Sequence, residues 1–377
     1  MIKLQKLISD LCPDGVSRVK IDDLIAYEQP TKYLVASKSY DDSYATPVLT
    51  AGQSFLLGYT NEVHGKYPAS VNSPVIIFDD FTTAYKWVDF EFKVKSSAMK
   101  MLTLKAGAQI SLRYFWYVLS TIQIDTSEHA RYWISKISNI EIPLPPAEIQ
   151  SEIVRILDTF TELEAELEAE LEARKNQYQH FSMSLLGLRH SETEKVRIAD
   201  VCRISRGTVI SKDYLREHPG EFPVYSSQTL NNGVFGYIDT FAYDFESLTW
   251  TTDGAKAGSI FYHQNEQFTI TNVCGLLQVL DHARVSTRFL YYALTAEAPK
   301  HVSAGMGNPK LMAGTMGEIE IGLPSIQKQE EIVSILDKFD ALVNGITEGL
   351  PAEIAARRSQ YEYFRSKLLT FEERDVA

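Results

Sequence analysis

Two long segments of the chain have apolar residues at alternating steps of four and three positions, which is the spacing of a coiled-coil seam. The seam residues are Ile149, Ile153, Ile156, Phe160 and Leu163 in the first segment and Ile332, Ile335, Phe339 and Leu342 in the second. Each segment follows a Leu-Pro pair and should form a helix of roughly forty residues, about 60 Å long. A lone amphipathic helix would be expected to pack on its own domain, whereas two matched seams favour pairing with each other.

The two helical segments are copies of one sequence. IEIPLPPAEIQSEIVRILDTF begins at residue 140 and IEIGLPSIQKQEEIVSILDKF at residue 319, so the copies start almost half of the 377-residue chain apart. A second pair of matching blocks, RKNQYQHFSMSLL and RRSQYEYFRSKLL, follows them, with four additional residues before the second block. Gly349 and Pro351 lie at this insertion, and they predict a kink or a short break in the second helix.

The segments before the two helices have short apolar runs separated by turns. Pro47-Val48-Leu49, VIIF from Val75 and FEFKV from Phe90 predict strands, and SLRYFWYVLSTI from Ser111 predicts a helix. The second globular segment repeats this order, since VRIADVC corresponds to VKIDDLI and STRFLYYALTA to SLRYFWYVLST. The predicted fold class is therefore α+β: two globular α/β-mixed domains, separated by two long helices that pair as an antiparallel coiled coil, in a pseudo-two-fold internal repeat.

The repeat also predicts where the domains begin and end. We expect an N-terminal domain at residues 1–144, a first long helix at 145–188, a C-terminal domain at 189–323, a second long helix at 324–371 with its kink near 349–351, and a tail at 372–377. Because the first helix leads from one domain to the other, an antiparallel pair of helices would hold a domain at each end.

Composition indicates a soluble globular protein, with 45% hydrophobic and 23% charged residues. No apolar run approaches 18 residues and the N-terminus lacks a signal-peptide core, so we expect a cytoplasmic protein without a membrane segment. The three cysteines lie far apart, which predicts reduced thiols rather than disulfides or a zinc site. The net charge of −12 argues against a nucleic-acid binder, but half of it comes from residues 146–186, with nine acidic and three basic side chains.

The sequence offers no convincing catalytic or metal site. Phosphate-binding loops, a dinucleotide fingerprint, HExxH and GxSxG are all absent, and so is the (N/D)PP(F/Y) tetrapeptide of amino-methyltransferases. Asp80 together with Glu91-Phe92-Lys93 weakly resembles the acidic cluster of metal-dependent nucleases, but the alternation around Glu91 is more typical of a half-buried strand. We therefore predict a protein with no catalytic residues and no metal, acting as a scaffold or binder.

The doubled LP…EIV.ILD.F block, each copy followed by R(K/R).QY…LL, closely resembles the specificity subunits of type I restriction–modification systems. GLPAEIAARRSQYEYFRSKLLTF near the end of the chain and YSSQTLNNGVFGYID in the second globular segment resemble the same family. The resemblance covers the full length, because the two motifs, their order and their half-chain period all match.

This resemblance implies a function without catalysis. Each globular domain would be a target-recognition domain that reads one half of a split site in double-stranded DNA. The helices would set the distance between the halves and dock two methyltransferase subunits. Those subunits, not this chain, would bind S-adenosylmethionine, and translocating restriction subunits could join the complex.

Side chains that contact DNA should lie on polar loops at matching places in the two domains. The candidates are Thr82, Thr83, Tyr85, Lys86, Arg131 and Tyr132 in the first domain and Ser226, Ser227, Gln228, Thr251, Thr252, Asp253, Lys256, Asn308 and Lys310 in the second. Lysine and arginine would mostly hold phosphates, glutamine and asparagine suit adenine, and Asp253 could accept a hydrogen bond from cytosine. The alternative is that these are ordinary turn residues and solvated lysines.

Two other functions remain open on the sequence. One is a protein-interaction scaffold with two binding modules on a coiled-coil strut and no role in DNA binding. The other is a nuclease or methyltransferase that acts alone, which the missing motifs disfavour.

Overall fold

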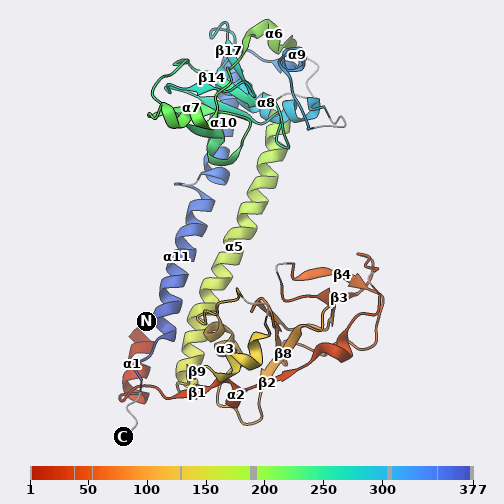
Figure 1. Cartoon of the computed structure of the whole chain (residues 1–377), viewed down its shortest axis with the longest axis vertical. Helices are drawn as coiled ribbons and strands as arrows, with labels where there is room; N and C mark the ends of the chain where they lie inside the picture. Colours follow the sequence, from red (N-terminus) through yellow and green to blue (C-terminus); the bar gives the residue numbers. More distant parts are fainter. Residues whose placement is uncertain are drawn as a thin grey trace. The chain divides into compact units, whose positions relative to one another are not determined.

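The computed structural model describes residues 2–37, 39–52, 54–127, 130–186, 193–303, 308–345 and 347–373. The chain forms two compact units, of which the first combines residues 1–166 with 355–377 and the second is residues 167–354. Each unit therefore contains one globular domain, the start of one long helix and the end of the other (Figure 1). This division cuts through the long helices, whereas the sequence-based division placed boundaries at their ends.

The globular part of the first unit has a four-stranded antiparallel sheet in the order β2-β8-β5-β6, a three-stranded sheet in the order β4-β3-β7, and the short pair β1-β9. The strands are β1 (Arg18–Lys20), β2 (Ile25–Glu28), β3 (Thr46–Leu49), β4 (Leu56–Thr60), β5 (Val75–Asp79), β6 (Tyr85–Val88), β7 (Lys93–Val94), β8 (Met99–Leu104) and β9 (Glu141–Pro143). The helices are α1 (Ile2–Leu11), α2 (Ile21–Leu24), η1 (Pro30–Tyr33), α3 (Leu112–Leu119), α4 (Tyr132–Ser135) and η2 (Ile137–Asn139).

The globular part of the second unit repeats this topology, with sheets β11-β17-β14-β15 and β13-β12-β16 and the pair β10-β18. Its strands are β10 (Glu194–Arg197), β11 (Cys202–Arg206), β12 (Phe222–Tyr225), β13 (Val234–Ile238), β14 (Ser247–Thr251), β15 (Ile260–His263), β16 (Thr269–Ile270), β17 (Cys274–Val279) and β18 (Glu320–Leu323). Its helices are α6 (Ile198–Val201), α7 (Lys212–Glu217), η3 (Leu230–Gly233), α8 (Thr287–Glu297), η4 (Ala298–His301) and α9 (Ala313–Glu318). The predicted α+β duplication is confirmed. The expected strand from Phe90 is shorter, since only Lys93 and Val94 are in β7.

The first long helix, α5 (Ala147–Leu185), is continuous for 39 residues and begins directly after the two prolines. The second is interrupted, with α10 (Ile326–Asn344) ending before α11 (Leu350–Leu369) begins. Gly349 has φ +88°, and a Cβ atom there would lie 2.4 Å from the carbonyl oxygen of Ala341, so no other residue fits this position. The interruption is thus a short break a few residues before the expected site, and Pro351 belongs to the first turn of α11.

In each unit the long helices meet through the same aromatic contacts. The Phe160 ring of α5 stacks on that of Phe364 in α11, with 5.5 Å between ring centroids. In the second unit Phe339 of α10, which corresponds to Phe160, lies 5.8 Å from Phe181 of α5. Phe364 and Phe181 occupy the same place in the second repeated block. The two units therefore have equivalent helix–helix contacts. In the first unit α5 contributes the first repeated block and α11 the second, and in the second unit α10 contributes the first and α5 the second.

The predicted seam is partly correct. Ile149, Ile153 and Ile332 are buried, and Ile156, Phe160 and Phe339 are half-buried, but Leu163, Ile335 and Leu342 are 40%, 41% and 37% exposed. Leu336 and Val343 occupy the buried positions that Ile335 and Leu342 were expected to fill. The shift has a physical reason, because the first turns of each helix pack on their own domain as well as on the other helix. The buried stripe is therefore wider than a two-helix seam and rotated by one residue.

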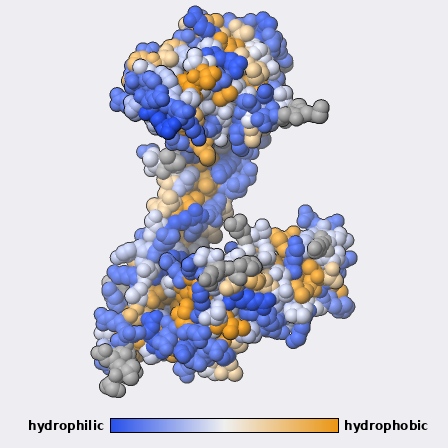
Figure 2. Space-filling model, in the orientation of Figure 1, coloured by the Kyte–Doolittle hydropathy of each residue, from blue (hydrophilic) through white to orange (hydrophobic). Residues whose placement is uncertain are grey.

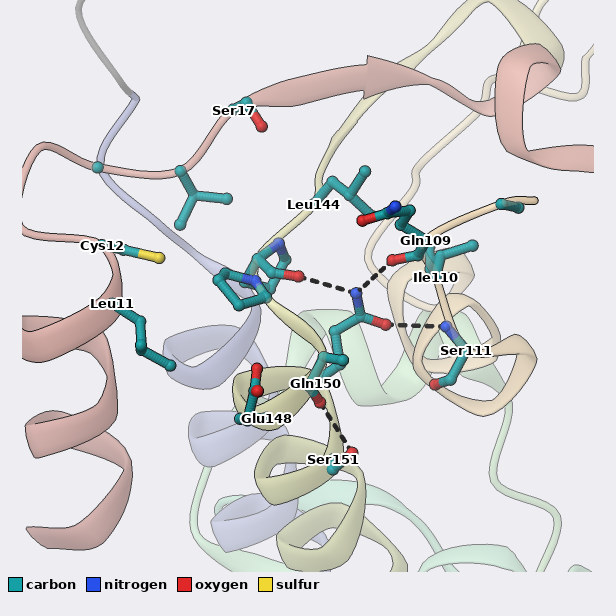
Figure 3. A pocket seen from close by; sticks show the side chains of 16 residues that line it. Leu11, Cys12, Ser17, Gln109, Ile110, Ser111, Leu144, Glu148, Gln150 and Ser151 are labelled. Carbon is teal, nitrogen blue, oxygen red and sulfur yellow. Dashed lines mark hydrogen bonds between the residues drawn. The ribbon is translucent and has the colours of Figure 1, made fainter.

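A buried glutamine joins each long helix to its domain. In α5 the Gln150 amide Nε2 donates to the carbonyl oxygens of Gln109 (2.9 Å) and Pro145 (2.8 Å), and Oε1 accepts from the Ser111 amide (2.8 Å; Figure 3). Ser111 is also the N-cap of α3. One side chain thus satisfies three backbone groups at the junction of strand, helix and loop.

Gln329 repeats this clamp in the second unit, with the same three distances. Its Nε2 donates to the carbonyl oxygens of Arg284 (2.9 Å) and Pro324 (2.8 Å), and its Oε1 accepts from the Ser286 amide (2.8 Å). Gln150 and Gln329 are 2% and 0% exposed. The clamp is therefore a property of the repeat rather than of one domain.

An arginine on the next helix adds a second fastening. Arg113 of α3 pairs with Asp158 of α5 at 2.8 Å, and Arg288 of α8 pairs with Asp337 of α10 at 2.8 Å. Both guanidinium groups also lie over aromatic rings, Arg113 at 4.6 Å from the centre of Trp116 and Arg288 at 4.9 Å from that of Tyr291. The domain helix is thus held against the long helix at two points.

The first unit is closed by the far end of the chain. Leu368 and Leu369 of α11 are 4% and 7% exposed and belong to the same core as α3 and the start of α5. The Val16 amide donates to the Glu372 carbonyl at 3.0 Å, and Arg18 pairs with Glu373 at 3.3 Å.

We predict that replacing Gln150 by alanine destabilises the first unit by about 2–4 kcal/mol, because a buried side chain is removed and three backbone groups lose their partner. Hydrogen exchange read at single amides measures this locally. The Ser111 amide should lose protection in Q150A while the Ser286 amide keeps it, and Q329A should do the reverse. Ser151→Ala is the matched control, since the exposed Ser151 hydroxyl bonds only within its own helix. Unchanged protection of Ser111 in Q150A would contradict the clamp.

Candidate nucleic-acid interface

The first candidate loop is the turn between β5 and β6. The Asp79 carboxylate accepts hydrogen bonds from the amides of Phe81 and Thr82, both at 2.9 Å, and the Asp79 carbonyl accepts from the Thr83 amide at 3.0 Å. Thr83 has φ +59°, so the chain reverses through a left-handed residue. Thr82 is exposed at this turn. The turn is therefore rigid and presents a threonine to solvent.

Arg131 is brought to the same turn from a distant part of the sequence. The Tyr132 amide donates to the Asp80 carbonyl at 2.9 Å, which fixes the start of α4 beside the turn. The exposed Arg131 guanidinium lies 5.9 Å from the centre of the Phe81 ring. The exposed Arg131 and the polar turn at residues 79–83 therefore lie together, and we call this surface the first edge.

The structure contradicts Tyr132 as a contact with DNA, whereas for the half-buried Tyr85 such a contact stays a prediction. The Tyr132 side chain is fully buried in the core of the first unit. Tyr85 is half-buried against Trp116 at 6.1 Å between ring centroids, and burial raises its pKa to about 12. Both tyrosine rings pack in or against the apolar core of the first unit, and choosing candidates by their polar hydroxyl alone does not detect this. Lys86, the next residue of β6, is half-buried.

The second domain has a corresponding edge at the end of β14. Asp253 and Lys310 form an antiparallel bridge, and the Gly254 amide donates to the Pro309 carbonyl at 3.0 Å. Lys256, Asn308 and Lys310 are exposed. The structure therefore brings together two segments that the sequence suggested separately.

Asp253 at this edge has a carboxylate oxygen with unused hydrogen-bonding capacity. Its Oδ1 atom is buried, and it has no hydrogen-bond partner among the residues that the structure describes. A buried carboxylate oxygen without a partner is costly, unless a ligand supplies a donor.

The threonines of this edge form the loop rather than line its surface. Thr251 and Thr252 are 0% and 1% exposed. The Thr251 hydroxyl donates to the Lys256 carbonyl and accepts from the Ser259 amide, so it holds the loop closed. These two candidates are therefore not available for direct contact with DNA.

Ser226, Ser227 and Gln228 follow β12 in the smaller sheet and are half-buried. The Ser226 hydroxyl accepts from the Thr271 hydroxyl at 3.0 Å, and the Gln228 amide donates to the Val234 carbonyl. The structure thus gives Ser226 and Gln228 a local bonding role, and the role of all three candidates towards DNA stays a prediction.

A buried hydroxyl–imidazole–carboxylate array lies under the second edge. Thr249 Oγ1 is 2.8 Å from Nε2 of His263, and Nδ1 of His263 is 3.0 Å from the Glu266 carboxylate. The hydrogen bond with His263, and after it the one from Tyr225, lower the pKa of Glu266. The order of groups matches a hydrolytic triad. Thr249 is 0% and His263 4% exposed, however, so no substrate reaches the hydroxyl and the array is a structural network. No local motif marks these three positions in the sequence.

A pocket of about 800 Å³ lies in the first unit where α1, the loop before α3 and the start of α5 meet (Figure 3). Its wall includes Cys12, Ser17 and Glu148, together with the Gln150 amide. That amide is fully engaged by the clamp described above, and the remaining wall is largely aliphatic or proline. The pocket therefore lacks a constellation for acid–base or nucleophilic chemistry.

Among the described residues, no group of three or more His, Cys, Asp and Glu side chains could hold a metal ion. Burial raises the pKa of the Cys202 and Cys274 thiols to about 12, which leaves them protonated and unreactive. Within the same described part of the chain, no helix is long and apolar enough to cross a membrane. The visible face of each domain is mostly hydrophilic with small apolar patches (Figure 2).

Comparisons with known proteins agree with this picture of a duplicated binding protein. Residues 13–173 and 190–356 match the family described as type I restriction modification DNA specificity domain. The EcoR124I/EcoR124II specificity subunit of Escherichia coli is 38% identical over 98% of this chain and 97% of that protein. A putative type I specificity subunit of Mycoplasma pneumoniae, S.MpnORF615P, is 41% identical over 60% of this chain and 92% of that protein.

Solved structures show the same fold. The type I restriction–modification S subunit from M. genitalium superposes with a TM-score of 0.63 at 16% identity, covering 94% of this chain and 96% of that one. A chain from a structure described by complex assembly and conformational transition of the type I R-M system gives a TM-score of 0.57 at 15% identity, covering 95% and 98%. With both repeats matched and a relative aligned along almost the whole length, the chain belongs to the family of type I restriction–modification specificity subunits.

Proposed function

We propose that this chain is the DNA sequence-specificity subunit of a type I restriction–modification complex and has no catalytic activity of its own. Each globular domain reads one half of a bipartite, gapped site in double-stranded DNA. The observation that carries the proposal is the repeated edge, in which a strand-end turn is fastened beside an exposed cation. That cation is Arg131 in the first domain and Lys310 in the second.

The chemistry of the two edges suits this task. Exposed lysine and arginine position a protein on phosphates, while base identity is read by a few polar groups. Asp253 is half-buried at the second edge, and a carboxylate there can accept a hydrogen bond from a cytosine amino group. The first edge offers Thr82 and the second Asn308, so the two domains present different groups and would read different half-sites.

The long helices fit the role of spacer and dock. α5 has 39 uninterrupted residues, about 58 Å at 1.5 Å per residue, and links one recognition domain to the other. Ile335, Leu342 and Met183 are exposed apolar side chains on helices of the second unit, available to partner subunits. We infer two methyltransferase subunits as these partners, which bring S-adenosylmethionine and the methyl transfer, with restriction subunits joining them in the cytoplasm.

The rival is a scaffold that binds only proteins. A scaffold of this kind does not explain why both domains have an exposed cation at the same place, or why a carboxylate, Asp253, lies beside the second one. An enzyme acting alone is disfavoured by the burial of the Thr249–His263–Glu266 array.

Methylome sequencing of cells with and without this chain, in the presence of its methyltransferase partner, tests the proposal. We expect a gapped two-part adenine-methylation motif that disappears when the chain is removed. An unchanged methylome would exclude the specificity role and favour the scaffold.

We predict that Lys256→Ala and Lys310→Ala each weaken DNA binding without changing the preferred sequence. Each removes one phosphate contact, so the slope of log K against log salt should fall in magnitude by about 0.9 per substitution. Binding isotherms of the methyltransferase complex at several salt concentrations measure this. Lys328→Ala is the control, because Lys328 is exposed on α10 and pairs with Glu331 in its own helix. A changed base preference in K310A would show that Lys310 reads bases instead.

We predict that deleting residues 349–352, about one helical turn, changes the tolerated gap between the half-sites but leaves each half-motif as it was. Motif analysis of DNA methylated by the deletion variant gives both quantities. Pro351→Ala keeps the length and should keep the gap. Altered half-motifs in the deletion variant would count against the helices as a spacer.

A further inference from the structure

The first edge, at Arg131, and the second edge, at Lys310, have corresponding backbones. Different side-chain interactions hold them against their domains. The shared part is a backbone hydrogen bond: the Tyr132 amide donates to the Asp80 carbonyl at 2.9 Å, and the Leu311 amide donates to the Thr252 carbonyl at 3.0 Å. In both domains this bond places the preceding cation, Arg131 or Lys310, beside the turn. The pairing of β5 with β8 and of β14 with β17 shows that Asp80 and Thr252 hold equivalent positions.

In the first domain the fastening is completed by a buried ion pair. One oxygen of Asp80 accepts from the Trp133 amide at 2.8 Å, and the other lies 3.1 Å from the Lys100 ammonium on β8. Both side chains are only 2% exposed. Lys100 also lies over the Tyr27 ring of β2, at 4.8 Å from its centre. Asp80 thus binds two consecutive amides of α4, Tyr132 through its backbone carbonyl and Trp133 through its carboxylate, and the ion pair joins them to β8 of the sheet.

In the second domain the corresponding segment is held without an ion pair. Gly275 occupies the position of Lys100, and the Trp250 ring covers it so closely that a Cβ atom there would be 2.2 Å from the indole. The Trp250 indole N–H donates to the Leu311 carbonyl at 2.9 Å. A neutral indole therefore holds the segment that carries Lys310.

A buried ion pair is a demanding way to hold a loop, because both charges leave water and neither tolerates the loss of the other. The second domain shows that the fold itself does not require this pair. Asp80 directly precedes Phe81, and its carbonyl accepts from the amide that follows Arg131. The ion pair therefore has a local role at the first edge. We propose that Asp80 and Lys100 are positioning residues for DNA reading by the first domain, which set the fidelity with which it selects its half-site. This inference rests on the proposed function.

The test uses the full chain in complex with its methyltransferase subunits and a library of duplex DNA, in which each half-site is randomised in turn at fixed spacing. For Asp80→Asn, which keeps an oxygen for the Trp133 amide but leaves Lys100 unpaired, we expect at least a tenfold loss of preference within one half-site only. Arg131→Ala should weaken binding through the same domain, and the half-site read by the second domain stays unchanged and serves as internal control.

Two further variants separate positioning from loss of folding. The double variant Asp80→Asn/Lys100→Met removes both charges and should recover part of the preference lost in D80N, since no unpaired charge remains. Glu62→Gln is the matched control, because it breaks the Glu62–Lys93 pair (2.6 Å), also shielded but in the smaller sheet of the same unit. Measurements are made well below the unfolding temperature of every variant. An equal loss of preference in E62Q, or an unchanged half-site preference in D80N, would overturn the inference. Failure of the unaltered complex to select any two-part site would instead overturn the proposed function.

Discussion

The buried glutamine at the start of each long helix is the constraint on which the remaining structure depends. Gln150 and Gln329 each satisfy three backbone groups that belong to a helix start, a strand end and a domain loop. A side chain that bonds all three fixes the angle at which a helix leaves its domain, because moving the helix would break all three bonds at once. The ion pairs of Arg113 with Asp158 and of Arg288 with Asp337 act about two turns further along the long helices. Any site on the domains is thereby held in a defined orientation to its own helix.

Above this common base the two domains differ in how they fill the same positions. Thr249 and His263 of the second domain occupy the positions held by Ile77 and Val88 in the first, so a polar network replaces apolar core residues. Lys100 of the first domain corresponds to Gly275 of the second, and an ion pair is exchanged for an indole. The two domains thus have different buried residues near their edges, although their strand order and their glutamine clamps are the same. Such a difference suits domains that must present different surfaces.

Much of the architecture could be predicted from the sequence, because the repeat, the Leu-Pro starts and the Ser111 helix cap are local signals. The glycine break was also visible, although its start depends on how α10 ends. The seam was misplaced at Ile335 and Leu342, since a heptad pattern ignores the domain that shares the helix surface. Polarity singled out Thr251 and Tyr132, but burial of a hydroxyl by its own loop, or of a tyrosine in a core, depends on contacts distant in sequence. For the same reason neither the Asp80–Lys100 pair nor the Asp253 oxygen could be recognised beforehand.

The closure of the first unit by residues 355–373 sets an order on how the protein matures during synthesis. The second unit is one continuous stretch, residues 167–354, so it can complete its core as soon as it leaves the ribosome. The first unit waits for Leu368 and Leu369 to fill its core, for roughly ten to forty seconds at about 5–20 residues per second. The N-terminal domain is therefore made first and finished last, and part of its apolar core stays uncovered in that interval.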